Sequence, residues 1–283
     1  MASVREPAPG PPGVFPRPLM GAIDPRRLRR LILERSYAAR VGHIGSALSV
    51  ADILAALYGG VLRIADPADP ERDRFVLSKG HAALALYAAL FLRGWVGSEE
   101  LGTFCGDGTL LGVHPEHQLR GVDFSTGSLG HGVSIGAGAA LAARLQRSAR
   151  RVFVLVSDAE CNEGALWEAA QFASHHRLSR LTVIVDANGQ QALGYTRDVL
   201  NLEPLAERWR AFGWNAVETD GHDVAGLSRL LAATPADGEA PRALVARTVF
   251  GKGVSFMESQ IKWHYWPMSE EEFARALSEV DAP

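Results

Sequence analysis

Two polar residues each follow an apolar run of the kind that forms a buried strand. Asp158 comes shortly after Val152–Val156, and Asn188 comes shortly after Leu181–Val185. A carboxylate and an amide oxygen are hard ligands that suit Mg²⁺ or Ca²⁺ rather than zinc, and Mg²⁺ usually completes its shell with phosphate oxygens and water. The pair suggests a metal that bridges a diphosphate to the protein. For such a pair alone, a helix cap at Asp158 and a chain turn at Asn188 would be the better explanation.

The elements around this pair predict that the two side chains meet. Both runs are short and rich in β-branched residues, as in fully buried strands. Between them, from about Glu163 to His176, apolar residues recur at helical spacing. A strand, helix and strand at this spacing form a right-handed crossover with parallel strands, and ligands bind at the carboxyl ends of such strands. The predicted fold class is α/β, a doubly wound, mostly parallel sheet with helices on both faces.

The rest of the chain extends the same architecture. Residues 1–20 are rich in Pro and Gly and predict a flexible arm, whereas residues 21–283 are long enough for one large domain. Apolar patterns predict helices over residues 26–40, 50–58, 82–92, 135–145, 205–212 and 224–233, and strands over residues 74–77, 215–218 and 243–248. The arginines of the first helix are interpreted as a solvated face, Asp220–Asp223 as a turn and helix cap, and His175 and His176 as complements to a helix dipole.

Composition excludes several classes of partner. The net charge is −3 and no basic block occurs, so we expect no nucleic-acid ligand. We also expect no membrane association, because no apolar run has the length of a signal peptide core or a membrane span. Cys105 and Cys161 are the two cysteines, too few for a disulfide framework and in keeping with a reducing compartment. We therefore expect a cytoplasmic protein.

Beyond the Asp158–Asn188 unit, several short motifs resemble those of the transketolase family. They occur in order between about Arg35 and His264, and the part they match is the amino-terminal domain, which binds thiamine diphosphate and its metal. The motifs are GHIGSALS (Gly42–Ser49), LSKGHA (Leu77–Ala82), GVHPE (Gly112–Glu116), STGSLGHG (Ser125–Gly132), GKGVSFME (Gly251–Glu258) and WH (Trp263–His264).

The resemblance implies a role for each matching position. Asp158, Asn188 and the backbone carbonyl of Gln190 would hold Mg²⁺, with Ca²⁺ as an alternative ion. His43, His114 and His264 would orient substrate oxygens and move protons, and Glu163 would connect two active sites across a subunit interface together with Glu168. The positions that would contact thiamine diphosphate are His81, Gly127, Ser128, Leu129, Asp158, Ala159, Glu163, Asn188 and His264.

The sequence also departs from the family pattern. Ser157 and Ala159 replace glycines that flank the metal-binding Asp, and a positive φ at Ala159 would cost about 1 kcal/mol. Gly106–Gly108 spells the family tripeptide, but no apolar strand precedes it and we interpret it as a turn. Tyr265 and Trp266 stand where a small glycine is common in the family, and two aromatic side chains there would narrow the substrate channel.

The pyrimidine-binding half of a transketolase has no counterpart before Pro283. We therefore expect a split enzyme, in which this chain binds the diphosphate and a separate pyrimidine-binding subunit completes an α₂β₂ assembly. The expected reaction transfers a two-carbon ketol unit from a ketose, such as a sugar phosphate, to an aldehyde. The alternatives are another thiamine-dependent carbon–carbon ligase, similar to deoxyxylulose phosphate synthase or in specialised metabolism, and a non-catalytic scaffold subunit.

Overall fold

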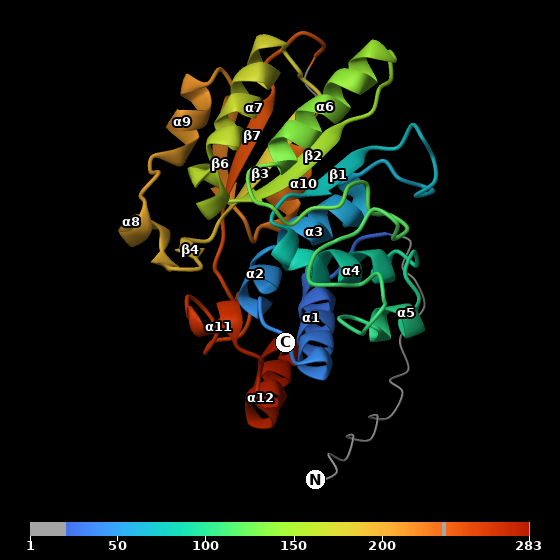
Figure 1. The fold of residues 1–283 in the computed structure, drawn as a ribbon, viewed down its shortest axis with the longest axis vertical. Helices are drawn as coiled ribbons and strands as arrows, with labels where there is room; N and C mark the ends of the chain where they lie inside the picture. Colours follow the sequence, from blue (N-terminus) through green and yellow to red (C-terminus); the bar gives the residue numbers. More distant parts are fainter. Residues whose placement is uncertain (1–20, 234–235, 283) are drawn as a thin grey trace.

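Five parallel strands form the central sheet of the computed structural model, which describes residues 21–233 and 236–282 (Figure 1). In spatial order they are β1 (Arg74–Leu77), β2 (Val152–Ser157), β3 (Leu181–Ala187), β7 (Arg242–Arg247) and β6 (Asn215–Asp220). The register pairs Ser157 with Asp186, so β2 and β3 end beside one another. The expected arm over residues 1–20 lies outside the described residues.

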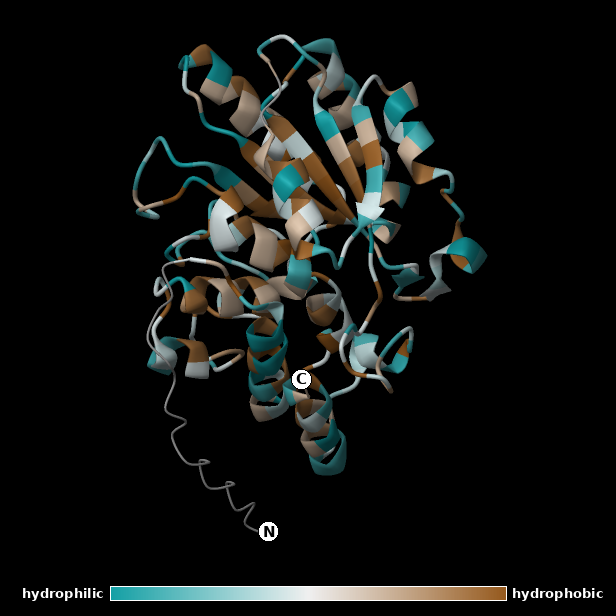
Figure 2. Cartoon of the chain, turned by 180° about the vertical axis from the view of Figure 1, so that it is seen from behind, coloured by the Kyte–Doolittle hydropathy of each residue, from teal (hydrophilic) through white to brown (hydrophobic). Residues whose placement is uncertain are grey.

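Helices cover both faces of this sheet, as the sequence predicts. On one face lie α6 (Gly132–Leu145), α7 (Gly164–His175) and α9 (Leu205–Ala211), packed on the valines of β2 and β3. The other face packs against α1 (Pro25–Ala39), α3 (Ala51–Ala56), α4 (Ala83–Leu92) and α10 (Val224–Ala232). Apolar residues, coloured brown in Figure 2, therefore concentrate in the strands between the two helical layers.

The remaining elements are short or lie at the chain end. α12 (Glu270–Asp281) packs beside α1, and Figure 1 shows both on the side of the molecule where the chain ends. The short helices are α5 (Ser98–Gly102), α8 (Thr196–Val199), α11 (Lys262–Tyr265) and the 3₁₀ turns η2 (Gly80–Ala82) and η3 (Ala159–Asn162), and β4 (Gln190–Gln191) pairs with β5 (Gly194–Tyr195). No helix within the described ranges is both long and apolar enough to span a bilayer.

One predicted helix is wrong in its bounds. In place of a single helix over residues 50–58, α2 (Ile44–Ser49) and α3 follow one another, and a π-helical turn, η1 (Leu57–Val61), ends the segment. Tertiary contacts explain the early start, because a Cβ added to Gly45 would lie 2.1 Å from the Phe250 ring, and Gly251 N–H donates to the Gly45 carbonyl at 3.0 Å. Close packing thus fixes a helix that glycine alone disfavours.

Not all arginines of the first helix lie on a solvated face, contrary to the expectation from the sequence. Arg29 is buried and pairs with the buried Asp52 carboxylate, which His222 Nδ1 contacts at 2.6 Å. Burial raises the pKa of Asp52, but hydrogen bonds from His222 and Arg29 together with their charges bring it below its ordinary value. Asp223 caps α10 as expected, through Gly226 N–H. His222 is therefore more than part of a turn, because it also ties α3 to the end of β7.

Candidate active site

Asp158 and Asn188 lie just beyond neighbouring strands, and the chain brings them to the same edge of the sheet. Asp158 Oδ2 accepts a hydrogen bond from Gly189 N–H at 2.7 Å, which links the two strand ends directly. Asn188 Oδ1 accepts from Gln190 N–H at 2.9 Å. These are the local capping and turn roles that the sequence allows. Each oxygen retains a further lone pair, so neither role removes the capacity to bind a cation.

The electrostatic environment of Asp158 favours a nearby positive charge. Burial, followed by the adjacent Asp186 carboxylate, raises the pKa of Asp158 to about 7, against the opposing effect of two backbone N–H groups. Among the described residues, no three His, Cys, Asp or Glu side chains are placed to hold a metal ion. A cation here would therefore take amide and carbonyl oxygens from Asn188 and Gln190, which are ligands that suit Mg²⁺ and Ca²⁺.

A buried ion pair that was not predicted supports this edge of the sheet. The side chains of Lys79 and Asp186 are both 0% exposed and contact one another. Asp186 also accepts hydrogen bonds from Thr248 and, at 2.8 Å each, from Ser49 Oγ and Asn188 Nδ2. The Asn188 amide is thereby fixed with its oxygen directed away from Asp186.

The pKa of Asp186 reflects this network. Burial raises it, but the charge of Lys79 and the hydrogen bonds from Lys79, Thr248 and Ser49 bring it below its ordinary value. Asp186 therefore stays ionised and holds Lys79 and Asn188 in place. The sequence signal for Asp186 is an acidic residue directly after the apolar run. In the structure this residue lies inside the strand, because β3 continues to Ala187 and does not end at Val185 as predicted.

Three histidines from distant parts of the chain meet in front of these strand ends. His43 precedes α2, His81 lies in η2 after β1, and His264 lies in α11. The ring centroids are 5.4 Å apart for His43 and His81, 5.3 Å for His43 and His264, and 5.8 Å for His81 and His264. His43 N–H donates to the His264 carbonyl at 3.2 Å, which joins the first and last of these segments.

These imidazoles are neutral at physiological pH. Burial lowers the pKa of all three, and the Lys79 charge and the other histidines lower it further. The pKa of His264 falls to about 4. Nδ1 of His43 and Nδ1 of His264 are buried without a hydrogen-bond partner in the described structure. Buried polar atoms are normally paired, so these two nitrogens mark a place for a polar ligand and fit a bound cofactor or substrate.

The glycine-rich segment around Gly127, Ser128 and Leu129 lies against His114 and against Gly80, the residue before His81. A Cβ added to Gly127 would lie 3.3 Å from the His114 ring, and one added to Gly80 would lie 3.0 Å from Gly127 N. His114 is thus brought beside the segment, and its carbonyl accepts from the Tyr87 hydroxyl at 3.0 Å. The absence of side chains at both glycines lets three predicted motifs pack together.

Two glutamates connect this segment to β2 and α7. Glu160, which is not among the predicted site residues, is buried and accepts from Gly130 N–H at 2.8 Å and from Ser78 Oγ. Gly130 has a φ of +86°, and a Cβ there would lie 2.6 Å from Glu163 Cβ. Glu163 occupies the N-cap position of α7, which begins at Gly164, so it does not lie in the first turn, and its side chain makes no capping hydrogen bond. Like Glu168, it is exposed in this chain.

Ala159 does not adopt the positive φ that would strain an alanine. Positive φ among the described non-glycine residues is confined to other positions, and Ala159 begins η3 directly after Asp158. Its N–H donates to Asp158 Oδ1 at 2.8 Å, and Ser157 Oγ accepts from Glu160 N–H at 3.1 Å. Alanine and serine therefore fit without backbone cost. As predicted, Asp107 and Gly108 form a turn.

Tyr265 and Trp266 stand at the surface beside His264, with 53% and 63% of their area exposed. The Tyr265 hydroxyl donates to the Ala192 carbonyl, and a Cβ on Gly42 would lie 2.5 Å from the Tyr265 carbonyl oxygen. The backbone of Tyr265 is therefore packed tightly on the segment that carries His43, whereas Trp266 projects outward.

Two small cavities lie at the site. A cavity of about 10 Å³ lies between His43, His81 and Phe104, and another of about 70 Å³ lies beside Asp158 and Gly189. Pockets that enclose a small molecule usually hold about 300–1,000 Å³. Neither of these two cavities is large enough to enclose a cofactor by itself.

Comparisons with known proteins agree with this geometry. The profile described as "Transketolase, thiamine diphosphate binding domain" matches residues 25–280. The chain is 37% identical over 254 residues to a subunit of the apulose-4-phosphate transketolase of Phocaeicola vulgatus, covering 89% of this chain and 90% of that protein. It is 41% identical over 258 residues to the 6-deoxy-6-sulfo-D-fructose transketolase subunit SqwG of a Clostridium species, covering 90% and 94% respectively.

Solved structures give the same fold at lower identity. The transketolase of Campylobacter jejuni superposes with a TM-score of 0.83 at 30% identity, over 90% of this chain and 42% of that one. The transketolase of Leishmania mexicana gives a TM-score of 0.82 at 29% identity, over 90% and 40%. The chain thus spans about two fifths of these longer proteins and nearly the full length of the two bacterial relatives above.

Proposed function

Because the chain belongs to the transketolase family, in which it matches the thiamine diphosphate-binding domain, we propose that it is the diphosphate-binding subunit of a two-subunit transketolase. The observation that carries the proposal is the strand-end pair of Asp158 and Asn188, together with a cluster of three histidines whose pKa values are lowered by burial and by the charge of Lys79, the partner of Asp186. The unpaired nitrogens of His43 and His264 support a ligand between them. The domain that does this work comprises residues 21–283.

In this proposal each group on the chain has a physical task. Asp158, Asn188 and the Gln190 carbonyl hold Mg²⁺, which neutralises the Asp158 carboxylate in its buried setting. His81 and His264 hold phosphate oxygens, and Gly127, Ser128, Leu129 and Ala159 present backbone to the cofactor. Bound thiamine diphosphate supplies the carbon nucleophile that breaks and forms the carbon–carbon bond.

Histidines handle the protons of the substrate in this proposal. His43, His114 and His264 orient hydroxyl oxygens, and the neutral imidazoles of His43 and His264 can accept a proton from a hydroxyl and return it. The low pKa of His264 keeps it in this form throughout the neutral range. Glu163 is exposed and lies beside the glycine-rich segment, which supports the role of a link to a partner subunit.

The missing part of the site is assigned to a separate pyrimidine-binding transketolase subunit in an α₂β₂ assembly. Support comes from the small cavity beside Asp158, which is too small to enclose the cofactor by itself, and from relatives that are themselves named as subunits. We place the assembly in the cytoplasm, in keeping with the free thiols of Cys105 and Cys161.

The substrate class is a ketose donor with an anionic group and an aldehyde acceptor. The names of the relatives include a sugar phosphate and a sulfonated sugar, so the anionic group need not be a phosphate. A ketose donor is favoured over pyruvate because these relatives are named transketolases. The unstrained backbone at Ala159 supports an intact site and so favours the enzyme over the scaffold alternative.

The proposal is tested by reconstitution with a separate pyrimidine-binding transketolase subunit. The complex should lengthen an aldehyde acceptor by two carbons when given a ketose phosphate or sulfonate, as followed by mass spectrometry. His43→Ala should lower kcat but retain the affinity for thiamine diphosphate, whereas Asp158→Ala should abolish both the activity and the binding of thiamine diphosphate. Consumption of pyruvate with release of carbon dioxide, or a complex that holds no thiamine diphosphate, would contradict the assignment.

A further inference from the structure

Large hydrophobic side chains are exposed on the surface formed by the β4–β5 hairpin, α8 and α11. Soluble monomers usually expose such side chains singly, and a contiguous group of them marks an interaction site. Within the described part of the chain, twelve large hydrophobic residues are exposed, and seven of them belong to these short segments. The seven, which we call the hairpin patch, are Leu193, Tyr195, Val199, Leu200, Ile261, Tyr265 and Trp266.

Hydrogen bonds join the segments of the hairpin patch, although they are far apart in the sequence. The Tyr265 hydroxyl donates to the Ala192 carbonyl in the turn of the hairpin. The Tyr195 hydroxyl donates to the Ser259 carbonyl at 3.3 Å, two residues before Ile261. Figure 1 shows β4, α8 and α11 on the same side of the molecule. The exposed side chains therefore belong to one continuous surface.

The charged side chains of these segments are paired within the chain. Arg197 contacts the neighbouring Asp198 at 3.6 Å, and Lys262 pairs with Glu272 of α12. The hairpin patch thus combines exposed aromatic and aliphatic side chains with no unpaired Lys, Arg, Asp or Glu of its own segments. Depletion of charge and enrichment in Tyr and Trp are typical of the core of a protein–protein interface.

The hairpin patch borders the proposed cofactor site. Leu200 lines the cavity beside Asp158. Tyr265 directly follows His264, and the centroids of their rings are 5.1 Å apart. Gln190, whose carbonyl is proposed as a metal ligand, begins β4. A second protein that completes the cofactor site would therefore lie next to this surface.

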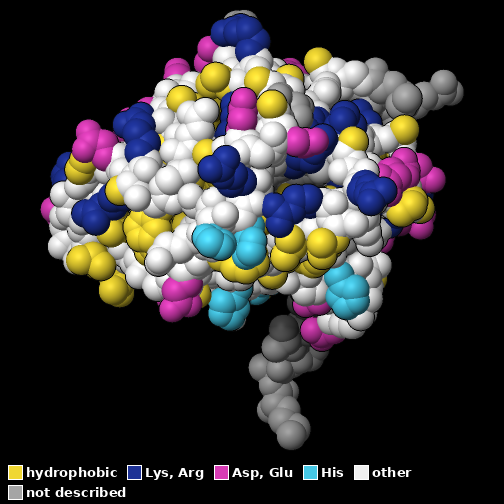
Figure 3. Space-filling view, turned by 90° about the horizontal axis from the view of Figure 1, so that it is seen from above, with side chains coloured by type: hydrophobic (Ala, Val, Ile, Leu, Met, Phe, Trp, Pro, Cys, Tyr) yellow, Lys and Arg dark blue, Asp and Glu magenta, His cyan; other side chains and the backbone are white. Residues whose placement is uncertain are grey.

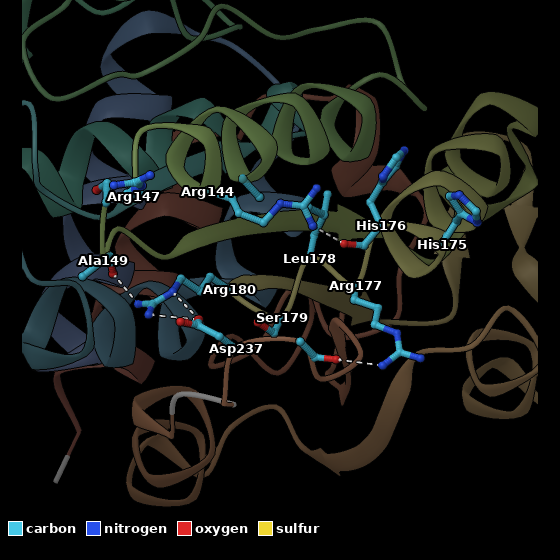
Figure 4. A pocket seen from close by; sticks show the side chains of 13 residues that line it. Arg144, Arg147, Ala149, His175, His176, Arg177, Leu178, Ser179, Arg180 and Asp237 are labelled. Carbon is cyan, nitrogen blue, oxygen red and sulfur yellow. Dashed lines mark hydrogen bonds and ion pairs between the residues drawn. The ribbon is translucent and has the colours of Figure 1, made fainter.

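The end of the molecule at which α6 and α7 end is a poor match for an apolar partner. A cavity of about 640 Å³ opens there, and its arginine side chains lie apart and point in different directions (Figure 4). Figure 3 shows Lys and Arg side chains spread over this end of the molecule. Leu145 is 75% exposed here but directly follows Arg144 in the chain. Covering this end with apolar groups would remove water from guanidinium groups, which is unfavourable.

We propose that the pyrimidine-binding subunit docks on the hairpin patch, with Trp266 and Leu193 as its main anchors on this chain. The inference rests on the proposed function, because it identifies the surface on which the two subunits of the transketolase meet. Leu193 and Trp266 have the largest exposed fractions in the patch, 80% and 63%, so docking removes the most apolar area from water at these two residues. Tryptophan is also among the residues that most often dominate the affinity of an interface.

The test measures the dissociation constant between the full chain and a separate pyrimidine-binding transketolase subunit by sedimentation velocity. Trp266→Ala should weaken association about tenfold or more, whereas Trp266→Phe, which keeps an aromatic ring, should weaken it less. Leu193→Ala should weaken association about threefold or more. The control Leu145→Ala makes the same substitution at a leucine of similar exposure, 75% against 80%, and should leave the dissociation constant unchanged. Melting curves of all variants check that the fold is retained.

Each contrary result has a distinct meaning. If Trp266→Ala and Leu193→Ala bind the subunit as tightly as the unaltered chain, and the mixture still transfers a two-carbon unit, the docking surface is overturned but the transketolase function stands. If the unaltered chain does not associate with the subunit, the docking surface and the two-subunit function are both overturned. If the chain alone forms a dimer that Trp266→Ala dissociates, the patch joins two copies of this chain and the proposal is overturned.

Discussion

Replacing Lys79 by methionine should destabilise the protein strongly. Methionine has a similar length but no charge, so the substitution leaves the Asp186 carboxylate buried without its cation. Both side chains are 0% exposed, so solvent cannot screen the loss. Removing one partner of a buried ion pair typically costs about 3–5 kcal/mol. We expect a loss of this size in the free energy of unfolding at neutral pH.

The pH dependence of this loss provides a second check. In the unaltered chain the pKa of Asp186 lies below its ordinary value, so the stability that its carboxylate contributes is lost as the pH falls through that low pKa. Without Lys79, burial instead raises the pKa of Asp186, and the native state takes up a proton more readily than the unfolded chain. The difference between Lys79→Met and the unaltered protein should therefore shrink as the pH is lowered from about 7 to about 5.

Urea unfolding followed by circular dichroism measures both effects. The control is Lys252→Met, the same substitution at a pair with Glu258 whose side chains are 36% and 35% exposed, and it should cost less than about 1 kcal/mol. The double variant Lys79→Met with Asp186→Asn removes both charges and should recover part of the loss. A loss below about 1 kcal/mol for Lys79→Met alone would refute the role given to this ion pair.

Three further predictions concern the same site. The contribution of His264 to the free energy of unfolding should fall by about 3 kcal/mol as the pH drops from 6.5 to about 4, because the unfolded chain binds a proton at this position that the native chain does not. His264→Gln should therefore lose less stability over this pH range than the unaltered chain, and an equal pH dependence of the two proteins in urea unfolding would contradict the low pKa. Gly45→Ala should lower the free energy of unfolding by about 1–3 kcal/mol or more, because the added methyl group would overlap the Phe250 ring. The control Gly138→Ala, which lies in α6 with open space around it, should raise the free energy of unfolding by about 0.5–1 kcal/mol. A more stable Gly45→Ala variant in urea unfolding would contradict the packing described for Gly45. Ala159→Gly should leave cofactor affinity unchanged and lower stability slightly, and a gain in melting temperature would indicate strain at Ala159 after all.

The sequence predicts the sheet and its ends well because the signal is local. The runs that form β2 and β3 are apolar and short, and the polar residue after each run marks the carboxyl edge. The spacing between Asp158 and Asn188 then requires a crossover helix, and α7 is found between them. Local pattern and topology rules are sufficient for this part of the fold.

The rest depends on contacts between distant segments. The partner of Asp186 is Lys79, which is 107 residues away, so no local pattern reveals that both charges are buried together. Likewise α2 begins at Ile44 because Gly45 fits against Phe250, a contact that only the folded chain creates. The histidine cluster was found through family motifs, and its distances and low pKa values follow from packing that the sequence does not display.

The most direct test of the proposed function is calorimetric titration of thiamine diphosphate with Mg²⁺. It should be made on this chain alone, on its mixture with the pyrimidine-binding subunit, and on the same mixture carrying Asp158→Ala. We predict that binding appears or tightens sharply in the mixture, requires the metal, and is lost in the variant. Binding that needs no metal or survives Asp158→Ala would contradict the metal site, and no binding in any mixture would contradict the split transketolase itself.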